Sequence, residues 1–285
     1  MPEGPEVERN RRDLLALEQK RLQKVIFTPL ALKYQRYQIQ LDKLGLLQGK
    51  TLERLERRGK FLIWWFERFL ALTHLGMTGA WTIEKPAKDL SSEMPSNYAK
   101  VVLDFDGGMR AIFDDMRNFG RFQVFSSEQE LLEQVPSVKT LGINGLQEHF
   151  PQEQFEQLLS LPINQTKPLG EILISSRLVA EIGNVYKSEI LFLANLNPNT
   201  YANELSSSEK KGLGQSVSVI LKRAFEQNGA TVANYQTAVD TGQSQGLHNV
   251  YGKEGKPCAA CQSAIERIIQ KQRSTYYCPQ CQALK

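Results

Sequence analysis

The sequence has no apolar run long enough to cross a membrane as a helix. Its longest apolar run, Phe61–Phe66, is followed directly by Glu67 and Arg68, whereas a membrane-spanning helix needs about 20 apolar residues. The N-terminus is charged from Glu3 onward and does not resemble a secretory signal peptide. Repeats and low-complexity tracts are also absent, and the 41% apolar and 23% charged composition is typical of a globular protein. We therefore expect a cytoplasmic protein without a membrane partner.

Cysteine is scarce, with four residues among 285. Cytoplasmic thiols stay reduced, so these cysteines suggest a metal rather than disulfides. They form the pairs Cys258-x-x-Cys261 and Cys278-x-x-Cys281, with sixteen residues between the pairs, which matches the spacing of a tetrahedral Zn²⁺ site. Four thiolates leave no position for a water molecule, so we predict one structural zinc ion per chain rather than a catalytic one. The metal would supply the folding energy of a small hairpin.

Positive charge is concentrated at the C-terminus. The formal net charge is +4, and residues 253–285 account for all of it with six basic and two acidic residues. Such a basic region is consistent with a polyanionic partner, or with ordinary solvated surface. Lys271 and Arg273 lie between the cysteine pairs. A zinc-held turn would direct them either at phosphates or into solvent.

The residue patterns predict an α+β protein. After a first helix to about Gln19, residues 22–125 have mostly strand-like patterns. They include a hairpin in which Tyr98–Phe105 and Arg110–Phe113 flank a glycine-containing turn. We therefore predict an N-terminal β-sandwich with a flanking helix.

The second half of the chain is expected to be helical. Apolar residues at helical spacing begin at about Pro151, and Ser206 with Glu209 predicts a helix N-cap. Residues 240–249 lack periodicity and predict a loop, and the polar stretch Ser126–Asn144 predicts a linker. The predicted domains are a β-sandwich (1–130), a linker (131–150), a helical domain (151–235) and a C-terminal loop with the zinc hairpin (236–285).

The N-terminus offers a possible nucleophile, because removal of Met1 would leave Pro2 with a free secondary amine. We expect Pro2 at the start of a helix, where proline is tolerated, with Glu3 and Glu6 in the same first turn. The helix dipole favours the neutral amine, and an α-amino group titrates near ~8. A neutral amine can form a Schiff base with a sugar carbon while a carboxylate moves protons. On residue types alone, an ordinary helix start is the alternative.

Six motifs in order resemble the superfamily of bacterial formamidopyrimidine-DNA glycosylase and endonuclease VIII, which are helix–two-turn–helix enzymes. The motifs are Pro2-Glu3-x-Pro5-Glu6, Arg57-Arg58-Gly59-Lys60, His74-Leu75-Gly76-Met77-Thr78-Gly79, Asp115-Met116-Arg117-Asn118-Phe119-Gly120, Ile182-Gly183-Asn184-Val185-Tyr186, and Gln272-Arg273-Ser274-Thr275 between the cysteine pairs. The resemblance spans the whole chain. It implies that residues 151–235 form a helix–two-turn–helix domain and that the loop after it covers the flipped base.

The resemblance implies a monomeric bifunctional DNA glycosylase and AP lyase that acts on damaged duplex DNA at the bacterial nucleoid. Pro2 would attack C1′ and Glu3 would be the acid–base residue, and the iminium would serve as the electron sink for β,δ-elimination without an organic cofactor or catalytic metal. Lys60, Asn184 and Arg273 would bind the phosphates around the flipped nucleotide, with Lys60 and Arg273 in the catalytic set. Alternative roles are a charged strand flank for Lys60 and a helix N-cap for Asn184.

The resemblance further implies that Met77, Arg117 and Phe119 fill the gap left in the duplex, and that Arg117 reads the opposite base. A flipped base costs a few kcal/mol of stacking, and an apolar wedge with a planar guanidinium suits the gap. Core packing is the alternative for Met77 and Phe119, although both lie beside glycines in turn-like sequence. His74 joins the DNA-binding set, with a hydrogen-bonded structural role as its alternative.

The gap-filling residues resemble the formamidopyrimidine branch, whose substrates are oxidised purines such as 8-oxoguanine opposite cytosine. Gly4 instead resembles the endonuclease VIII branch, which acts on oxidised pyrimidines. We predict oxidised purines, because the gap-filling residues contact DNA; the alternatives are an endonuclease VIII-like glycosylase or a damaged-DNA-binding protein that does not cut. The chain departs from the branch at Gly170, Ser175, Ser176 and Glu181. Glu181 would place negative charge near a phosphate site unless its side chain points away.

Overall fold

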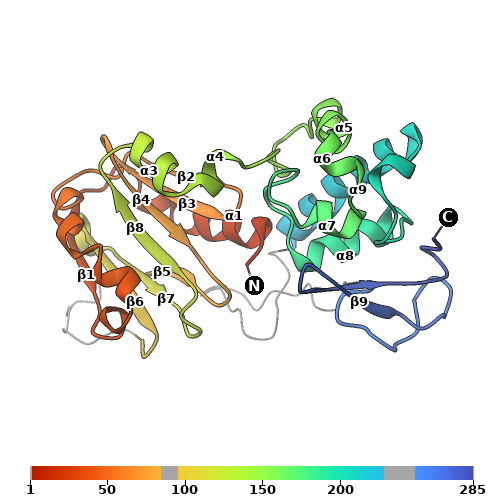
Figure 1. The fold of residues 1–285 in the computed structure, drawn as a ribbon. Helices are drawn as coiled ribbons and strands as arrows, with labels where there is room; N and C mark the ends of the chain where they lie inside the picture. Colours follow the sequence, from red (N-terminus) through yellow and green to blue (C-terminus); the bar gives the residue numbers. More distant parts are fainter. Residues whose placement is uncertain (1, 85–95, 228–247, 285) are drawn as a thin grey trace. The chain divides into compact units, whose positions relative to one another are not determined.

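The computed structural model describes residues 2–84, 96–227 and 248–284, which form two compact units (Figure 1). The first unit contains Pro2 and residues 6–139, and the second contains residues 3–5, 140–227 and 248–284. The boundary between the units therefore passes through the Pro2–Glu3 peptide. Among the helices of the described residues, none is both long enough and apolar enough to span a membrane.

The first unit is a sandwich of two four-stranded antiparallel sheets, as predicted. In strand order, the sheets are β1(Leu22–Phe27)-β6(Ala99–Phe105)-β7(Arg110–Asp114)-β5(Ala80–Glu84) and β2(Arg54–Arg58)-β3(Phe61–Phe66)-β4(Phe69–His74)-β8(Arg121–Phe125). The predicted hairpin is confirmed: β6 and β7 pair antiparallel and are joined through the 3₁₀ turn η4 (Asp106–Gly108).

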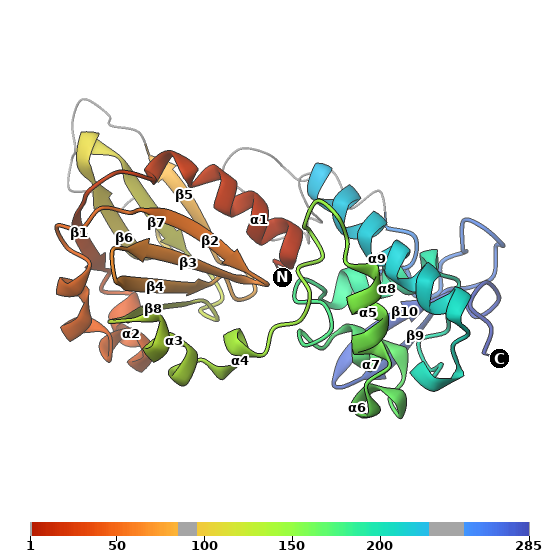
Figure 2. The same ribbon diagram turned by 90° about the horizontal axis from the view of Figure 1, so that it is seen from above.

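Strand β3 is buried on both faces, which explains its uninterrupted apolar run. Leu62, Trp64 and Phe66 point into the core between the two sheets. Ile63 and Trp65 point the other way, into a second cluster that includes Leu131 of α3 (Glu128–Gln134) and Val138 of α4 (Pro136–Lys139). Two helices therefore cover the outer face of this sheet (Figure 2).

Two local expectations are corrected in the first part of this unit. Helix α1 (Gly4–Asp13) ends before Gln19 and is followed by the 3₁₀ turn η1 (Leu15–Leu17). The segment between β1 and β2 is not a strand; it contains η2 (Ala31–Lys33), α2 (Gln35–Gln38) and η3 (Leu41–Leu46). Its core residues Ala31, Tyr34, Tyr37, Leu44 and Leu47 mostly recur every three residues, which suits 3₁₀ turns.

The polar stretch Ser126–Asn144 is also more structured than expected, because it contains α3 and α4. The side chain of Ser127 accepts the amide of Glu130 at 3.2 Å and so caps α3. A polar composition did not distinguish this short amphipathic helix from a loop.

The second unit is mainly helical, as predicted. Its helices are α5 (Gln152–Leu159), α6 (Pro162–Gln165), α7 (Leu169–Leu173), α8 (Asn184–Leu193) and α9 (Ser207–Glu226), with η5 (Ala202–Glu204) before α9. They share one core that includes Phe155, Leu173, Ile190 and Leu221. The predicted cap of α9 is confirmed, because Ser206 and Glu209 exchange side-chain and backbone hydrogen bonds in a capping box.

Residues 248–284 form the C-terminal module of this unit. Strands β9 (Glu266–Gln270) and β10 (Arg273–Tyr277) pair in an antiparallel hairpin. Lys271 and Gln272 form its turn with φ of 48° and 59°, the left-handed conformation of a two-residue hairpin turn. The loop expected at 240–249 lies outside the described residues up to residue 247.

Candidate active site and zinc centre

Pro2 is buried and lies two residues before the first residue of α1. The expectation that Pro2 and Glu3 lie in the first turn of α1 is therefore wrong. Only Glu6 occupies that turn. The Glu3 carboxylate, next to Pro2 in the chain, instead caps α8.

The Glu3 carboxylate caps α8, which follows it by about 180 residues in the chain. It accepts the amides of Gly183 at 2.7 Å, Val185 at 2.8 Å and Tyr186 at 3.3 Å, and the residue is 1% exposed. These amides have no carbonyl partner within the helix, and the helix end carries partial positive charge. The carboxylate is thereby held in one position beside Pro2 in the chain.

Gly183 makes room for this cap. A Cβ atom at position 183 would lie 2.3 Å from Glu3 Cδ, which no real Cβ tolerates. Gly183 is the N-cap residue and Asn184 is the first residue of the helix, so the N-cap alternative for Asn184 is wrong. The Oδ1 atom of Asn184 is buried and has no hydrogen-bond partner in the described part of the chain.

Arg273 is exposed at the first position of β10, which packs against α8. The neighbouring turn residue Lys271 instead lies 3.3 Å from the carboxylate of Glu171. Lys187 of α8, which the sequence analysis missed, is fully buried near Glu3 and Arg273. Burial lowers the pKa of Lys187 to about 8; the negative charge of Glu3 opposes this effect and the positive charge of Arg273 adds to it.

The predicted gap-filling residues come from two turns of the first unit that are bonded together. The Thr78 hydroxyl donates to Asp115 at 2.8 Å and accepts the amide of Arg117 at 3.0 Å. The other carboxylate oxygen of Asp115 accepts the amide of Gly120 at 2.6 Å. Because Asp115 is fully buried, these bonds fix the turn that carries Arg117.

The side chains on these turns face outward. Phe119 is 54% exposed, so the core-packing alternative is wrong for it. The guanidinium carbon of Arg117 lies 5.5 Å from the centroid of the Phe119 ring. Met77 is half-buried. An aromatic ring and a cation thus stand together on a rigid turn.

Arg36 supports this turn and was also missed. Its Nη2 donates to the carbonyl of Asn118, a residue with φ of 57° between Arg117 and Phe119. The guanidinium also lies 4.9 Å from the Tyr34 ring centroid. Arg36 belongs to a segment expected as strand, and no local pattern linked it to a turn some eighty residues later.

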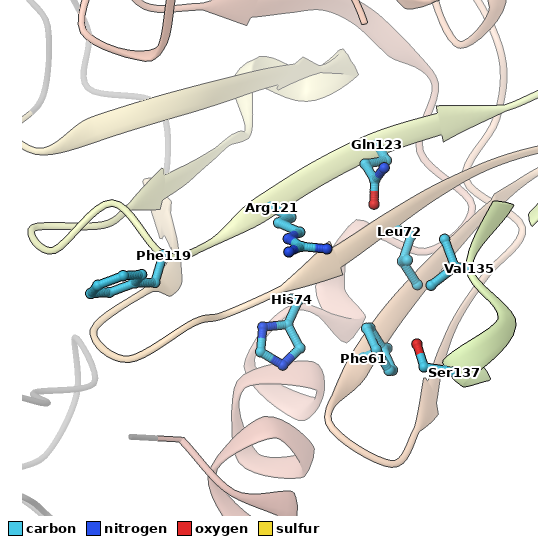
Figure 3. A pocket seen from close by; sticks show the side chains of 8 residues that line it. All are labelled: Phe61, Leu72, His74, Phe119, Arg121, Gln123, Val135 and Ser137. Atoms are coloured by element: carbon cyan, nitrogen blue, oxygen red, sulfur yellow. The ribbon is translucent and has the colours of Figure 1, made fainter. Parts of the chain in front are cut away.

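His74 ends β4 opposite Arg121 of β8 and lines a cavity of about 260 Å³ with it (Figure 3). The cavity is lined by Phe61, Leu72, His74, Phe119, Arg121, Gln123, Val135 and Ser137. His74 Nδ1 accepts the amide of Gly76 at 3.1 Å, so the neutral ring carries its proton on Nε2. Burial, together with the positive charges of Lys60 and Arg121, lowers the pKa of His74 to about 4. The ring is therefore a neutral hydrogen-bond donor.

The four cysteines converge on one point. Their sulfur atoms all lie within 4.8 Å of one another, with Cys258 and Cys281 at 3.9 Å and Cys261 and Cys278 at 3.3 Å. Four ligands at the usual Zn–S distance would place sulfur atoms ~3.8 Å apart. The cluster therefore fits a single tetrahedral zinc ion.

Two of the departures from the family motifs are matched by a neighbour. Glu181 is fully buried and its carboxylate accepts the amide of Gly145 at 2.8 Å, so the charge is not presented at the surface. A Cβ atom at Gly4 would lie 2.2 Å from Glu181 Cβ. Likewise, a Cβ atom at Gly170 would lie 1.8 Å from Gln270 Oε1. In both pairs the glycine leaves the space that the larger side chain fills.

Comparisons with known proteins agree with this geometry along the whole chain. Residues 1–122 match the formamidopyrimidine-DNA glycosylase N-terminal domain, residues 141–236 the H2TH domain of the same enzymes, and residues 255–284 the zinc finger found in FPG and IleRS. With the four-sulfur cluster, the last match identifies a structural zinc ion held by Cys258, Cys261, Cys278 and Cys281.

Curated relatives and solved structures extend the likeness. The formamidopyrimidine-DNA glycosylase of Ligilactobacillus salivarius is 32% identical over 100% of both chains, and that of Enterococcus faecalis is 34% identical over 100% of this chain and 98% of its own. The Thermus thermophilus FPG structure has a TM-score of 0.82 with 32% identity, covering 100% of both chains. The Lactococcus lactis FPG complex with FAPY-dG-containing DNA has a TM-score of 0.82 with 28% identity, covering 98% of this chain and 99% of its own.

If zinc holds the C-terminal module together, removal of one cysteine ligand should lose the metal and unfold the module at the same time. Cys278→Ser should abolish stoichiometric zinc and melt the module, because the module has only a small core and apparent binding energies of such sites are on the order of 10 kcal/mol. Metal analysis and hydrogen exchange of residues 248–284 measure this, with exposed Lys256→Ala as control. Unchanged zinc content and protection in Cys278→Ser would contradict the assignment.

The lowered pKa of His74 predicts a pH-dependent stability. Below pH ~6.5 the unfolded chain protonates this histidine, whereas the folded protein does not until about pH 4. The free energy of unfolding should therefore fall between these values, by roughly 2–3 kcal/mol. Urea unfolding of His74→Asn, which retains an acceptor for the Gly76 amide, should lack this loss, and the exposed control His149→Asn should retain it. Parallel curves for His74→Asn and wild type would refute the cause.

Proposed function

Because the chain belongs to the bacterial formamidopyrimidine-DNA glycosylase family, it is a DNA glycosylase for damaged bases, and we propose that Pro2 and Glu3 carry its chemistry. AP lyase activity, typical of this family, would follow base removal. The observation that most supports the proposal is the Glu3 carboxylate, which three amides of α8 hold one peptide bond from Pro2.

Once Met1 is removed, the neutral Pro2 nitrogen attacks C1′ of the damaged nucleotide and the C1′–N bond to the base breaks. The departing base takes up a proton and the Pro2 nitrogen loses its own. The nitrogen lone pair then expels O4′, so the C1′–O4′ bond breaks, O4′ is protonated and the opened sugar carries the iminium at C1′. Glu3 would transfer protons at the sugar. The iminium withdraws electrons from C2′, whose proton is removed as the 3′ phosphate leaves. A second elimination expels the 5′ phosphate, so both strand ends carry phosphate.

The phosphates would be held by groups from several elements. Asn184 begins α8 and Arg273 begins β10, while Lys60 lies in the turn between β2 and β3. The Nε2–H of neutral His74 suits a phosphate oxygen as acceptor. The zinc ion supports this arrangement by holding the hairpin that carries Arg273, and no step passes through the metal.

The exposed ring and guanidinium of Phe119 and Arg117 support an oxidised-purine specificity, with 8-oxoguanine opposite cytosine as the leading substrate. Gly4 was the sequence feature that favoured oxidised pyrimidines. Its close approach to Glu181 accounts for the glycine without reference to the substrate. A non-cutting DNA-binding protein would have no need for the buried carboxylate next to Pro2.

The cellular setting follows from the substrate. We place the enzyme in the bacterial cytoplasm at the nucleoid, acting as a monomer, because all proposed ligands belong to one chain. Its bacterial relatives support this setting.

Substitution of the proposed catalytic pair tests the chemistry. Glu3→Gln and Pro2→Gly should each lower base excision from an 8-oxoguanine–cytosine duplex by roughly 100-fold or more, and the borohydride-trapped cross-link of the wild type should map to residue 2. Duplex affinity and melting temperature serve as controls for folding. Full excision in either variant would remove that residue from the mechanism.

Arg117→Ala tests the reading of the opposite base. We expect the ratio of excision rates opposite cytosine and opposite adenine to change by roughly 10–100-fold, because a guanidinium–base pair of hydrogen bonds discriminates by about 1–3 kcal/mol. Arg68→Ala, an exposed arginine of the same unit, is the matched control and should keep the ratio. An unchanged ratio in Arg117→Ala would show that Arg117 does not read the opposite base.

A further inference from the structure

Lys187 is a buried amine with no hydrogen-bond partner among the residues that the structure describes. The residue is 0% exposed, and its Nζ makes no hydrogen bond or ion pair in the described part of the chain. An isolated ammonium away from water costs several kcal/mol. Such a group is either neutral or provided with an anion when the protein works.

Within the described residues, no carboxylate is hydrogen-bonded to the Lys187 amine. The Glu3 carboxylate acts on Lys187 electrostatically but is bound by three amides of α8. Arg273, from the adjoining strand β10, contributes a second positive charge. The nearest carboxylate on α8 itself, Glu189, accepts the amides of residues 249–251. The surroundings of Lys187 therefore have a cationic surplus at the start of α8.

Two further polar atoms at this end of α8 lack partners. Asn184 Oδ1 and His248 Nε2 are both buried and form no hydrogen bond within the described residues. Asn184 lies one turn before Lys187, on the same face of the helix. The His248 ring is affected by the charges of Glu189 and Glu3 and packs edge-on against Tyr251 at 5.8 Å. The Asn184 oxygen needs a donor, whereas the Lys187 amine and the His248 ring nitrogen can each donate to an acceptor that the described residues do not supply.

The charge surplus selects the class of ligand. A neutral ligand would leave the ammonium uncompensated, whereas a phosphodiester supplies a charged acceptor to the two cations. We propose that Lys187 is a further ligand of the DNA backbone, binding the same phosphate as Asn184 and Arg273. The proposal rests on the proposed function of this site. The flexible four-carbon stem of lysine lets the amine reach a phosphate held by exposed Arg273 without displacement of α8.

The assignment has a pH signature. The pKa of Lys187 is about 8 in the free protein, and a bound phosphate raises it, so binding takes up protons near pH 8. The contribution of Lys187 to DNA affinity is largest at pH values below 8, where the amine is protonated, and decreases as the pH rises above 8. Burial lowers the pKa of His248 below its usual range and raises that of Tyr251, so neither titrates in this window. The other charged groups that act on Lys187 are the carboxylate of Glu3 and the guanidinium of Arg273, and Glu189 is the carboxylate on the same helix.

The experiment measures binding to a duplex with tetrahydrofuran opposite cytosine, an abasic-site analogue without a C1′ hydroxyl that cannot react with Pro2. Lys187→Gln should bind about tenfold or more weakly at pH 7, and its plot of log affinity against log salt should be shallower by ~0.9. Wild type should lose up to about tenfold in affinity from pH 8 to pH 9, and Lys187→Gln should lose less. Both proteins carry the Pro2 amine, so its titration changes their affinities equally and does not contribute to the difference between them.

Two variants separate charge from packing. Lys187→Arg should retain the salt slope, and exposed Lys211→Gln of α9 should behave as wild type. Zinc content and melting temperature verify folding. Equal affinity, slope and pH dependence in folded Lys187→Gln and wild type would overturn the proposal. If wild type neither binds this duplex nor forms a trapped cross-link on an abasic one, the proposed function itself fails.

Discussion

The contact on which the second unit depends is a buried carboxylate at the start of a helix. Glu3 satisfies three amides of α8, which would otherwise be unpaired in a site with little access to water. The same contact fixes the residue next to Pro2. Stabilising a helix end and fixing the proposed proton-transfer group are therefore one requirement, and the glycine at position 183 serves both because it leaves space for the carboxylate.

Helix α8 connects the rest of the site to this contact. Glu189, in its second half, accepts the amides of Asn249, Val250 and Tyr251 and so holds the start of the C-terminal module. The Ser188 hydroxyl accepts the amide of Tyr276 from β10 at 3.3 Å. The Glu3 carboxylate, the zinc-bound hairpin and the proposed phosphate ligands of the second unit thus all depend on α8.

The sequence predicts those features whose signals are local. The cysteine spacing indicated the zinc site, and the glycine-containing turn between two strand-like runs indicated the hairpin of β6 and β7. The roles of Arg36 and Lys187 depend on contacts between distant segments and have no local pattern. The placement of Glu3 was wrong for the same reason: the residue precedes α1 in sequence but caps α8, and only the tertiary structure distinguishes the two helices.

The pairing of Gly4 with Glu181 constrains how this chain can change over evolution. A larger residue at position 4 is blocked while Glu181 is present, because its Cβ atom would overlap the glutamate at 2.2 Å. If Glu181 were replaced by glycine first, a cavity and an unpaired Gly145 amide would remain. This change lowers the stability of the fold but causes no steric overlap. The two positions are therefore epistatic, and one order of substitution is far more accessible than the other. A substrate specificity inferred from residue 4 alone would therefore reflect the presence of Glu181, not the damaged base that the enzyme removes.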